Sequence, residues 1–165
     1  MRAALHYAKS LFGNSKIVGC EIGVNNGDNA RIIMDEWAYG LQILHLVELN
    51  ADKESTIRNK LGNPSWPDHQ HILHIGDSSE IAATFSDASL DFVYIDDNHT
   101  ESGVTKSIDA WWPKVKIGGV FGGHDYIWNH WDLAGCAVKK VVDKWSIDHN
   151  QWLQLGEYDW WCVKR

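Results

Sequence analysis

Short apolar runs alternate with longer amphipathic stretches along most of this chain. Five runs rich in Ile, Val, Leu and Phe have the length of strands, and polar or glycine residues flank each of them. These predicted strands span residues 17–24, 44–49, 72–75, 92–96 and 119–122. The amphipathic stretches predict helices over residues 29–37, 52–61, 79–85, 102–112 and 133–145.

Strands that alternate with helices in this way form a parallel sheet with helices on both faces. The chain ends differently, because two strand-like runs, residues 152–155 and 160–163, are joined by a short Gly-Glu-Tyr-Asp segment. Strands connected so tightly must be antiparallel. The pattern therefore predicts an α/β fold with a mostly parallel sheet of seven strands that closes with an antiparallel hairpin.

Length and composition restrict the class of protein. With 165 residues and 44% hydrophobic content, the chain can form one core and is too short for two ordinary domains, so we expect a single domain over residues 1–165. A net charge of −7 argues against a nucleic-acid or anionic membrane partner. No signal peptide or membrane-spanning run is evident, and three cysteines without metal-ligand spacing indicate reduced thiols. We expect a cytoplasmic protein.

The segment VGCEIGVNNG, residues 18–27, carries the most specific signal in the chain. It leads from a predicted strand into a helix, with Gly23 and Gly27 four residues apart and Glu21 two residues before Gly23. Glycines allow a sharp turn and let a ligand approach the backbone amides. A dinucleotide fingerprint would need glycine at Asn25, and a phosphate loop would need Gly-Lys-Ser/Thr. An acidic residue here instead suits a positively charged cofactor such as S-adenosylmethionine.

The next predicted strand supports a cofactor site. It places Glu48 about 20 residues past the glycine loop, where an acidic side chain of a doubly wound fold accepts hydrogen bonds from ribose hydroxyls. A solvated strand end is the alternative for this residue alone. The loop and Glu48 together favour the cofactor interpretation.

Five segments in this order resemble the class I S-adenosylmethionine-dependent methyltransferases. They are EIGVNNG (21–27), VEL (47–49), GDS (76–78), FVYIDDNH (92–99) and GGVFGGHDY (118–126). The last two are most similar to the metal-dependent O-methyltransferases that act on small molecules of the sugar, macrolide or catechol type. The resemblance implies a Rossmann-like fold and methyl transfer to a hydroxyl of a sugar, polyol or phenol.

The resemblance also implies a cofactor site. Its predicted residues are Glu21, Gly23, Asn25 and Gly27 at the methionine end, Glu48 at the ribose, Asp77 and Ser78 beside the adenine, and Asp96. Asn25 departs from the family pattern, because many members carry a third glycine there. Asp77 also suits the N-cap of the following helix, and the two roles are compatible.

Polar residues at two strand ends suggest a metal site. Asp96 ends the fourth predicted strand, and His124 and Asp125 follow the fifth. Ligands of open α/β sheets bind outside these carboxyl ends. Two carboxylates and an imidazole suit Mg²⁺, and the imidazole also admits Mn²⁺. In the related enzymes the metal binds the acceptor hydroxyl. The alternative is a metal-free enzyme in which Asp96 orients the cofactor amine and His124 is the base.

His99 is the candidate general base, because an imidazole titrates near neutral pH. The predicted catalytic residues are therefore His99, Asp96 and His124. The alternative is a polar loop in which Thr100 caps the next helix. We expect Asp97 to be a loop residue rather than a metal ligand.

The acceptor side is the least defined part of the site. Trp128 and Trp131 follow the GHDY segment and either form an aromatic wall over the acceptor or close the fold. About 16 residues precede the first strand, fewer than the helical lid of many relatives, so the pocket is open or completed by another subunit of a homo-oligomer. Two rival functions are a catalytically silent S-adenosylmethionine-binding subunit of a larger enzyme and, less favoured, a nicotinamide-dependent oxidoreductase.

Overall fold

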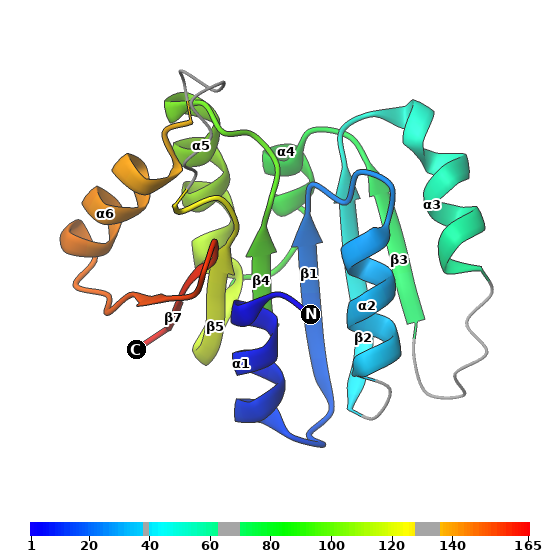
Figure 1. The fold of residues 1–165 in the computed structure, drawn as a ribbon, viewed down its shortest axis with the longest axis horizontal. Coiled ribbons are helices and arrows are strands. Elements are labelled where there is room, and N and C mark those ends of the chain that lie inside the picture. The colour runs from blue at the N-terminus through cyan, green and yellow to red at the C-terminus, as the bar shows by residue number, and fades with distance from the viewer. Residues whose placement is uncertain (38–39, 63–69, 128–135) are drawn as a thin grey trace.

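The computed structural model describes residues 1–37, 40–62, 70–127 and 136–165 and shows a central sheet between two helical layers (Figure 1). The sheet has seven strands in the order β3-β2-β1-β4-β5-β7-β6. Its strands are β1 (Ile17–Ile22), β2 (Leu41–Glu48), β3 (Gln70–Ile75), β4 (Leu90–Ile95), β5 (Val115–Gly123), β6 (Gln154–Leu155) and β7 (Trp160–Val163). The first five strands are parallel, and β7 runs antiparallel to both β5 and β6. The predicted sheet and closing hairpin are confirmed.

Helices cover both faces of the sheet. They are α1 (Ala3–Phe12), α2 (Asp28–Glu36), α3 (Glu54–Leu61), α4 (Ser78–Ala82), α5 (Glu101–Trp111) and α6 (Val138–Asp148), with 3₁₀ turns η1 (Ala51–Lys53) and η2 (Trp112–Lys114). Buried side chains of α1, α2 and α3 form one core with the sheet. Those of α4, α5 and α6 form a second core on the opposite face. In Figure 1, α1 and α2 lie in front of the strands.

The element boundaries differ from the predictions at several points. Helix α1 was not predicted, although Ala4, Leu5 and Ala8 form a buried stripe with helical spacing. Strands β2 and β5 begin three and four residues before the apolar runs that start at residues 44 and 119. The apolar pattern missed these first residues because exposed positions interrupt the first half of each strand. The first residues of the predicted helix 133–145 lie outside the described part of the chain, and α6 runs on to Asp148.

Two further findings concern membrane-spanning helices and the cysteines. Within the described residues, no helix has both the length and the apolar character required to cross a membrane. Cys20, Cys136 and Cys162 are all free cysteines.

Candidate active site

A cavity of about 690 Å³ opens where β1, β2, β3 and β4 end. Its volume is in the range of small-molecule and cofactor sites. Of the predicted cofactor residues, those that line it are Gly23, Asn25, Glu48, Asp77, Ser78 and Asp96. Glu21 and Gly27 are not among its lining residues, and His99 is. The structure therefore brings most of the predicted cofactor residues to one cavity.

The glycine loop packs tightly against the end of β4. Gly23 has φ +85°, and a Cβ at this position would lie 2.1 Å from the backbone oxygen of Asp96. No side chain fits there. Asn25 also has a positive φ of 54°, a conformation that asparagine tolerates better than most residues. Asn25 thus takes the left-handed conformation that a glycine would adopt readily.

Glu48 joins two loops at the cavity. It is buried, and its Oε2 accepts a hydrogen bond from the Asn25 backbone N–H at 2.7 Å. Its Oε1 accepts from the Asn50 backbone N–H at 2.9 Å. Glu48 is therefore not a solvated strand end, and it fixes the loop that carries Asn25.

Glu21 is a buried carboxyl group at the end of β1. It is 1% exposed, and its Oε1 accepts a hydrogen bond from Asn29 Nδ2 at 2.9 Å. Its Oε2 has no hydrogen-bond partner within the structure described. Burial raises the pKa of Glu21 to about 8, against the lowering effect of the Asn29 hydrogen bond. A buried acid with an unused oxygen fits a cationic group of a bound cofactor.

Asp77 begins helix α4. Its side chain accepts hydrogen bonds from the backbone N–H groups of Ser79, at 3.0 Å, and Glu80, at 3.3 Å. Lys106 Nζ lies 2.9 Å from its Oδ2. Hydrogen bonds from Ser79 and Lys106 lower the pKa of this carboxyl. The N-cap role considered for Asp77 is confirmed, while Ser78 beside it lines the cavity.

Four titratable side chains converge beside the cavity. Asp125 lies between two imidazoles, with Oδ1 2.7 Å from His124 Nδ1 and Oδ2 2.6 Å from His99 Nε2. Asp96 Oδ1 is 3.8 Å from His124 Nδ1 and 4.0 Å from His99 Nε2. Asp96 and His99 line the cavity, so this cluster borders the predicted cofactor site.

The pKa values of Asp96 and Asp125 differ because the surroundings of the two carboxyls differ. Burial raises the pKa of Asp96 to about 6, although the nearby His124 opposes the shift. Burial would also raise the pKa of Asp125, but hydrogen bonds from His124 and His99 outweigh it and hold the pKa at about 2. The hydrogen bond to Asp125 raises the pKa of His99. Asp125 is therefore the more strongly ionised carboxylate.

Asp96, His124 and Asp125 could together hold a metal ion. One ligand atom from each lies within 4.8 Å of the others, and this is the one such group of three among the described residues. Two carboxylates and an imidazole fit a hard or borderline divalent cation. The geometry brings together the three residues predicted as ligands.

Two residues near His99, in the loop after β4, have structural roles. The Thr100 side chain accepts a hydrogen bond from the Gly103 N–H at 3.1 Å and caps α5. Asp97 Oδ2 accepts from Ser107 Oγ at 2.7 Å, so it ties the loop to α5, as expected of a loop residue. The Thr100 cap does not involve the His99 side chain, which contacts Asp125. The cap is therefore compatible with a catalytic role for His99. Trp128 and Trp131 lie outside the described residues.

Sequence reasoning missed Arg2, Tyr94 and Asp159. The Arg2 guanidinium contacts His124 Nε2 and lies 3.5 Å from Asp96 Oδ2. Asp159 is buried and accepts hydrogen bonds from the Ala4 N–H at 2.9 Å and from Tyr94 OH at 3.0 Å. No local pattern marks Arg2, because its partner His124 is 122 residues away.

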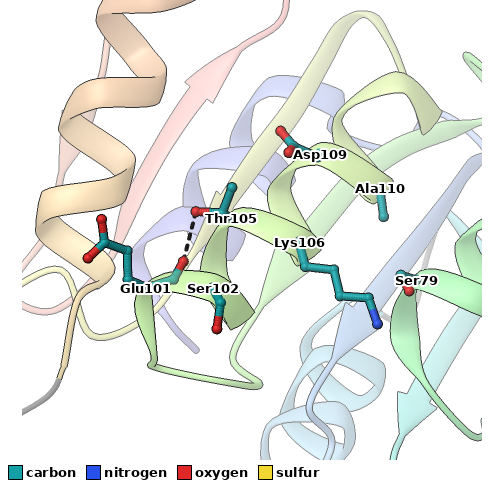
Figure 2. A pocket seen from close by; sticks show the side chains of 7 residues that line it. All are labelled: Ser79, Glu101, Ser102, Thr105, Lys106, Asp109 and Ala110. Carbon is teal, nitrogen blue, oxygen red and sulfur yellow. Dashed lines mark hydrogen bonds between the residues drawn. The ribbon is translucent and has the colours of Figure 1, made fainter.

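A second depression lies on the outer surface between α4 and α5 (Figure 2). Lys106 extends across it towards Ser79 in Figure 2, and Lys106 also lines the cavity of about 690 Å³. Two of the charged residues that line this depression are paired: Lys106 pairs with Asp77, and Glu101 pairs with Lys140 at 2.7 Å. Thr105 Oγ1 donates to the Glu101 backbone oxygen at 2.7 Å. This groove brings together no set of catalytic groups.

Comparisons with known proteins establish the family and the fold of this chain. The methyltransferase domain family matches residues 20–126. A solved structure from Staphylococcus aureus, proposed to be a caffeoyl-CoA O-methyltransferase, superposes with a TM-score of 0.75 at 19% identity over 100% of this chain and 84% of that one. The O-methyltransferase TomG from Streptomyces achromogenes, in complex with S-adenosylmethionine, gives 0.69 at 14% identity over 98% of this chain and 78% of its own.

A third structure is the methyltransferase MycE in complex with Mg, S-adenosylhomocysteine and mycinamycin VI. It gives a TM-score of 0.65 at 18% identity over 96% of this chain, which spans 48% of MycE. No curated protein sequence matches the chain. At these identities the solved structures establish the fold. The family match covers more than half of the chain, which therefore belongs to the methyltransferase domain family and has the class I fold of S-adenosylmethionine-dependent methyltransferases.

Proposed function

We propose that this protein transfers a methyl group from S-adenosylmethionine to a hydroxyl group of a small molecule, a sugar, polyol or phenol, with a divalent cation bound in the site. One observation carries the proposal. Asp96, His99, His124 and Asp125 converge at the edge of the cavity that holds most of the predicted cofactor residues.

The cofactor fits the loop after β1. Glu21 offers a buried carboxyl with an unpartnered oxygen, which would pair with the cofactor ammonium. Gly23, Asn25 and Gly27 shape the backbone beside the methionine end, and Glu48 at the cavity wall would bind the ribose. Ser78, with the capping residue Asp77, would border the adenine.

The cation would be held by Asp96, His124 and Asp125, and their oxygen-rich donor set favours Mg²⁺ or Mn²⁺. When bound, such a cation is a Lewis acid that lowers the pKa of an acceptor hydroxyl. The cluster and the cavity share Asp96 and His99, so a hydroxyl held at the cluster would lie beside the proposed cofactor site. Positioning of this kind supplies much of the rate enhancement of a displacement reaction.

His99 is the group suited to take the hydroxyl proton. Its Nε2 lies 2.6 Å from Asp125 Oδ2, and this carboxylate stabilises the imidazolium that forms when the ring accepts a proton. His124 is less suited, because its Nδ1 faces Asp125 and its Nε2 contacts Arg2. These contacts favour His99 over His124 as the base.

A methyl-transfer assay tests the proposal. Purified protein is incubated with S-adenosylmethionine labelled in the methyl group and a panel of catechols, polyols and sugars, with Mg²⁺, with Mn²⁺ or with EDTA. We expect label in at least one acceptor class and its loss in EDTA. Transfer that is unchanged in EDTA would remove the cation from the mechanism. Cofactor binding without transfer to any acceptor would instead favour the catalytically silent subunit.

A further inference from the structure

The Arg2 side chain lies inside the predicted cation site. Its guanidinium contacts His124 Nε2 and lies 3.5 Å from Asp96 Oδ2. Both residues are predicted cation ligands. The Arg2 side chain is still 36% exposed, so it reaches the cluster from the solvent side.

The start of helix α1 is held in place without Arg2. The Ala4 N–H donates to Asp159 Oδ2 at 2.9 Å, and Tyr94 OH donates to Asp159 Oδ1 at 3.0 Å. Leu5 and Ala8 are buried in the core beneath the helix. The Arg2 side chain can therefore leave the cluster while α1 stays where it is.

Three carboxylates surround the His124 ring. Its Nδ1 lies 2.7 Å from Asp125 Oδ1 and 3.8 Å from Asp96 Oδ1, and its Nε2 lies 3.9 Å from Asp159 Oδ1. Carboxylates this close together and removed from water need a compensating positive charge. In the structure described here, the Arg2 guanidinium supplies such a charge.

We propose that Arg2 is an internal competitor for the divalent cation, an inference that rests on the proposed cation site. The His124 ring nitrogen that faces Asp96 and Asp125 is Nδ1, and a cation bound there would leave the ring proton on Nε2, which could then no longer accept a hydrogen bond from Arg2. The cation would also repel the guanidinium at close range. Arg2 neutralises the cluster when the cation is absent and withdraws from it when the cation binds.

Manganese binding tests this competition. Mn²⁺ is titrated into wild-type protein and an Arg2→Met variant, which removes the charge at similar length, and free Mn²⁺ is counted by electron paramagnetic resonance. Arg31→Met is the matched control, because Arg31 is paired with Asp35 at 2.8 Å on α2 and its loss changes the net charge equally. We expect Arg2→Met to bind Mn²⁺ about tenfold more tightly, the size of a charged hydrogen bond, and the control to match wild type.

A second readout uses wild-type protein alone. Phenylglyoxal modifies accessible arginines, and peptide mass spectrometry reports the rate at Arg2. Release from His124 and Asp96 should make Arg2 react faster when Mn²⁺ is added, with Arg31 unchanged. An unchanged rate at Arg2 would contradict its withdrawal.

The outcomes separate the two proposals. Equal Mn²⁺ affinity in wild type and Arg2→Met would leave the cation site standing and overturn the competition, and weaker binding in the variant would overturn it too. Absence of Mn²⁺ binding in both proteins would overturn the cation site itself, and the role of Arg2 with it.

Discussion

Replacing Glu21 by glutamine should stabilise the cofactor-free protein and weaken cofactor binding. The pKa of Glu21 rises from an ordinary value of 4.5 to about 8 because the carboxyl is buried. Between these values the unfolded chain loses the proton and the folded chain keeps it, so stability falls as the pH rises from about 4.5 to 8. At pH 7, the interval of about 2.5 pH units above 4.5 corresponds to roughly 3 kcal/mol.

A glutamine avoids this cost because it is neutral at every pH. Its side-chain oxygen can still accept the hydrogen bond that Asn29 donates to Glu21 at 2.9 Å. We therefore expect Glu21→Gln to raise the free energy of unfolding by up to about 3 kcal/mol at pH 7 and by little near pH 4.5. The variant also cannot ionise to pair with the cofactor ammonium, so affinity for S-adenosylhomocysteine should fall at least about tenfold.

Urea denaturation of wild type and Glu21→Gln at pH 5 and pH 7.5 measures the first effect, and titration calorimetry with S-adenosylhomocysteine measures the second. Glu80→Gln serves as control, because Glu80 is exposed on α4. A Glu21→Gln variant that is less stable than wild type at pH 7.5 would refute the argument from burial. Unchanged affinity would refute the role of Glu21 at the cofactor.

Three further substitutions test other parts of the site. Gly23→Ala should lower the free energy of unfolding by about 3 kcal/mol or more, because the added Cβ would lie 2.1 Å from a backbone oxygen. Gly13→Ala, with nothing within 4 Å of the added Cβ, should lower it by only about 1–2 kcal/mol because of its left-handed backbone. Thermal unfolding measures both values. Equal losses would contradict the steric argument. Glu48→Ala should weaken S-adenosylhomocysteine binding in calorimetry, because it removes the proposed ribose acceptor and leaves two backbone N–H groups without their carboxylate partner. Asp96→Asn should abolish methyl transfer and largely preserve cofactor affinity; an active variant would argue against a cation at Asp96.

Much of the fold could be predicted because most strands are apolar and bounded by turn residues. Strand β4 is one example, with Phe92, Val93 and Tyr94 all buried between the two helical layers. Helix α1 was missed because two of its three buried residues are alanines, which give a weak amphipathic signal. The start of β5 was missed because exposed residues precede its buried half.

The site was predictable where topology alone brings residues together. Asp96, His124 and Asp125 follow neighbouring parallel strands, so their convergence follows from the carboxyl-end rule. The position of Arg2 depends on the packing of α1 against the sheet, and no spacing in the sequence indicates it. The link between Asp125 and His99 also depends on the positive φ of Asp125, 60°, which turns this residue at the end of β5.

Titration calorimetry with S-adenosylhomocysteine and, separately, NAD⁺, each with and without Mg²⁺, tests the central claim most directly. The proposed binding of the methyl donor in the cavity lined by Gly23, Glu48 and Ser78 predicts micromolar binding of S-adenosylhomocysteine and no heat with NAD⁺. Absence of S-adenosylhomocysteine binding under every condition, or binding of NAD⁺ in its place, would contradict the account.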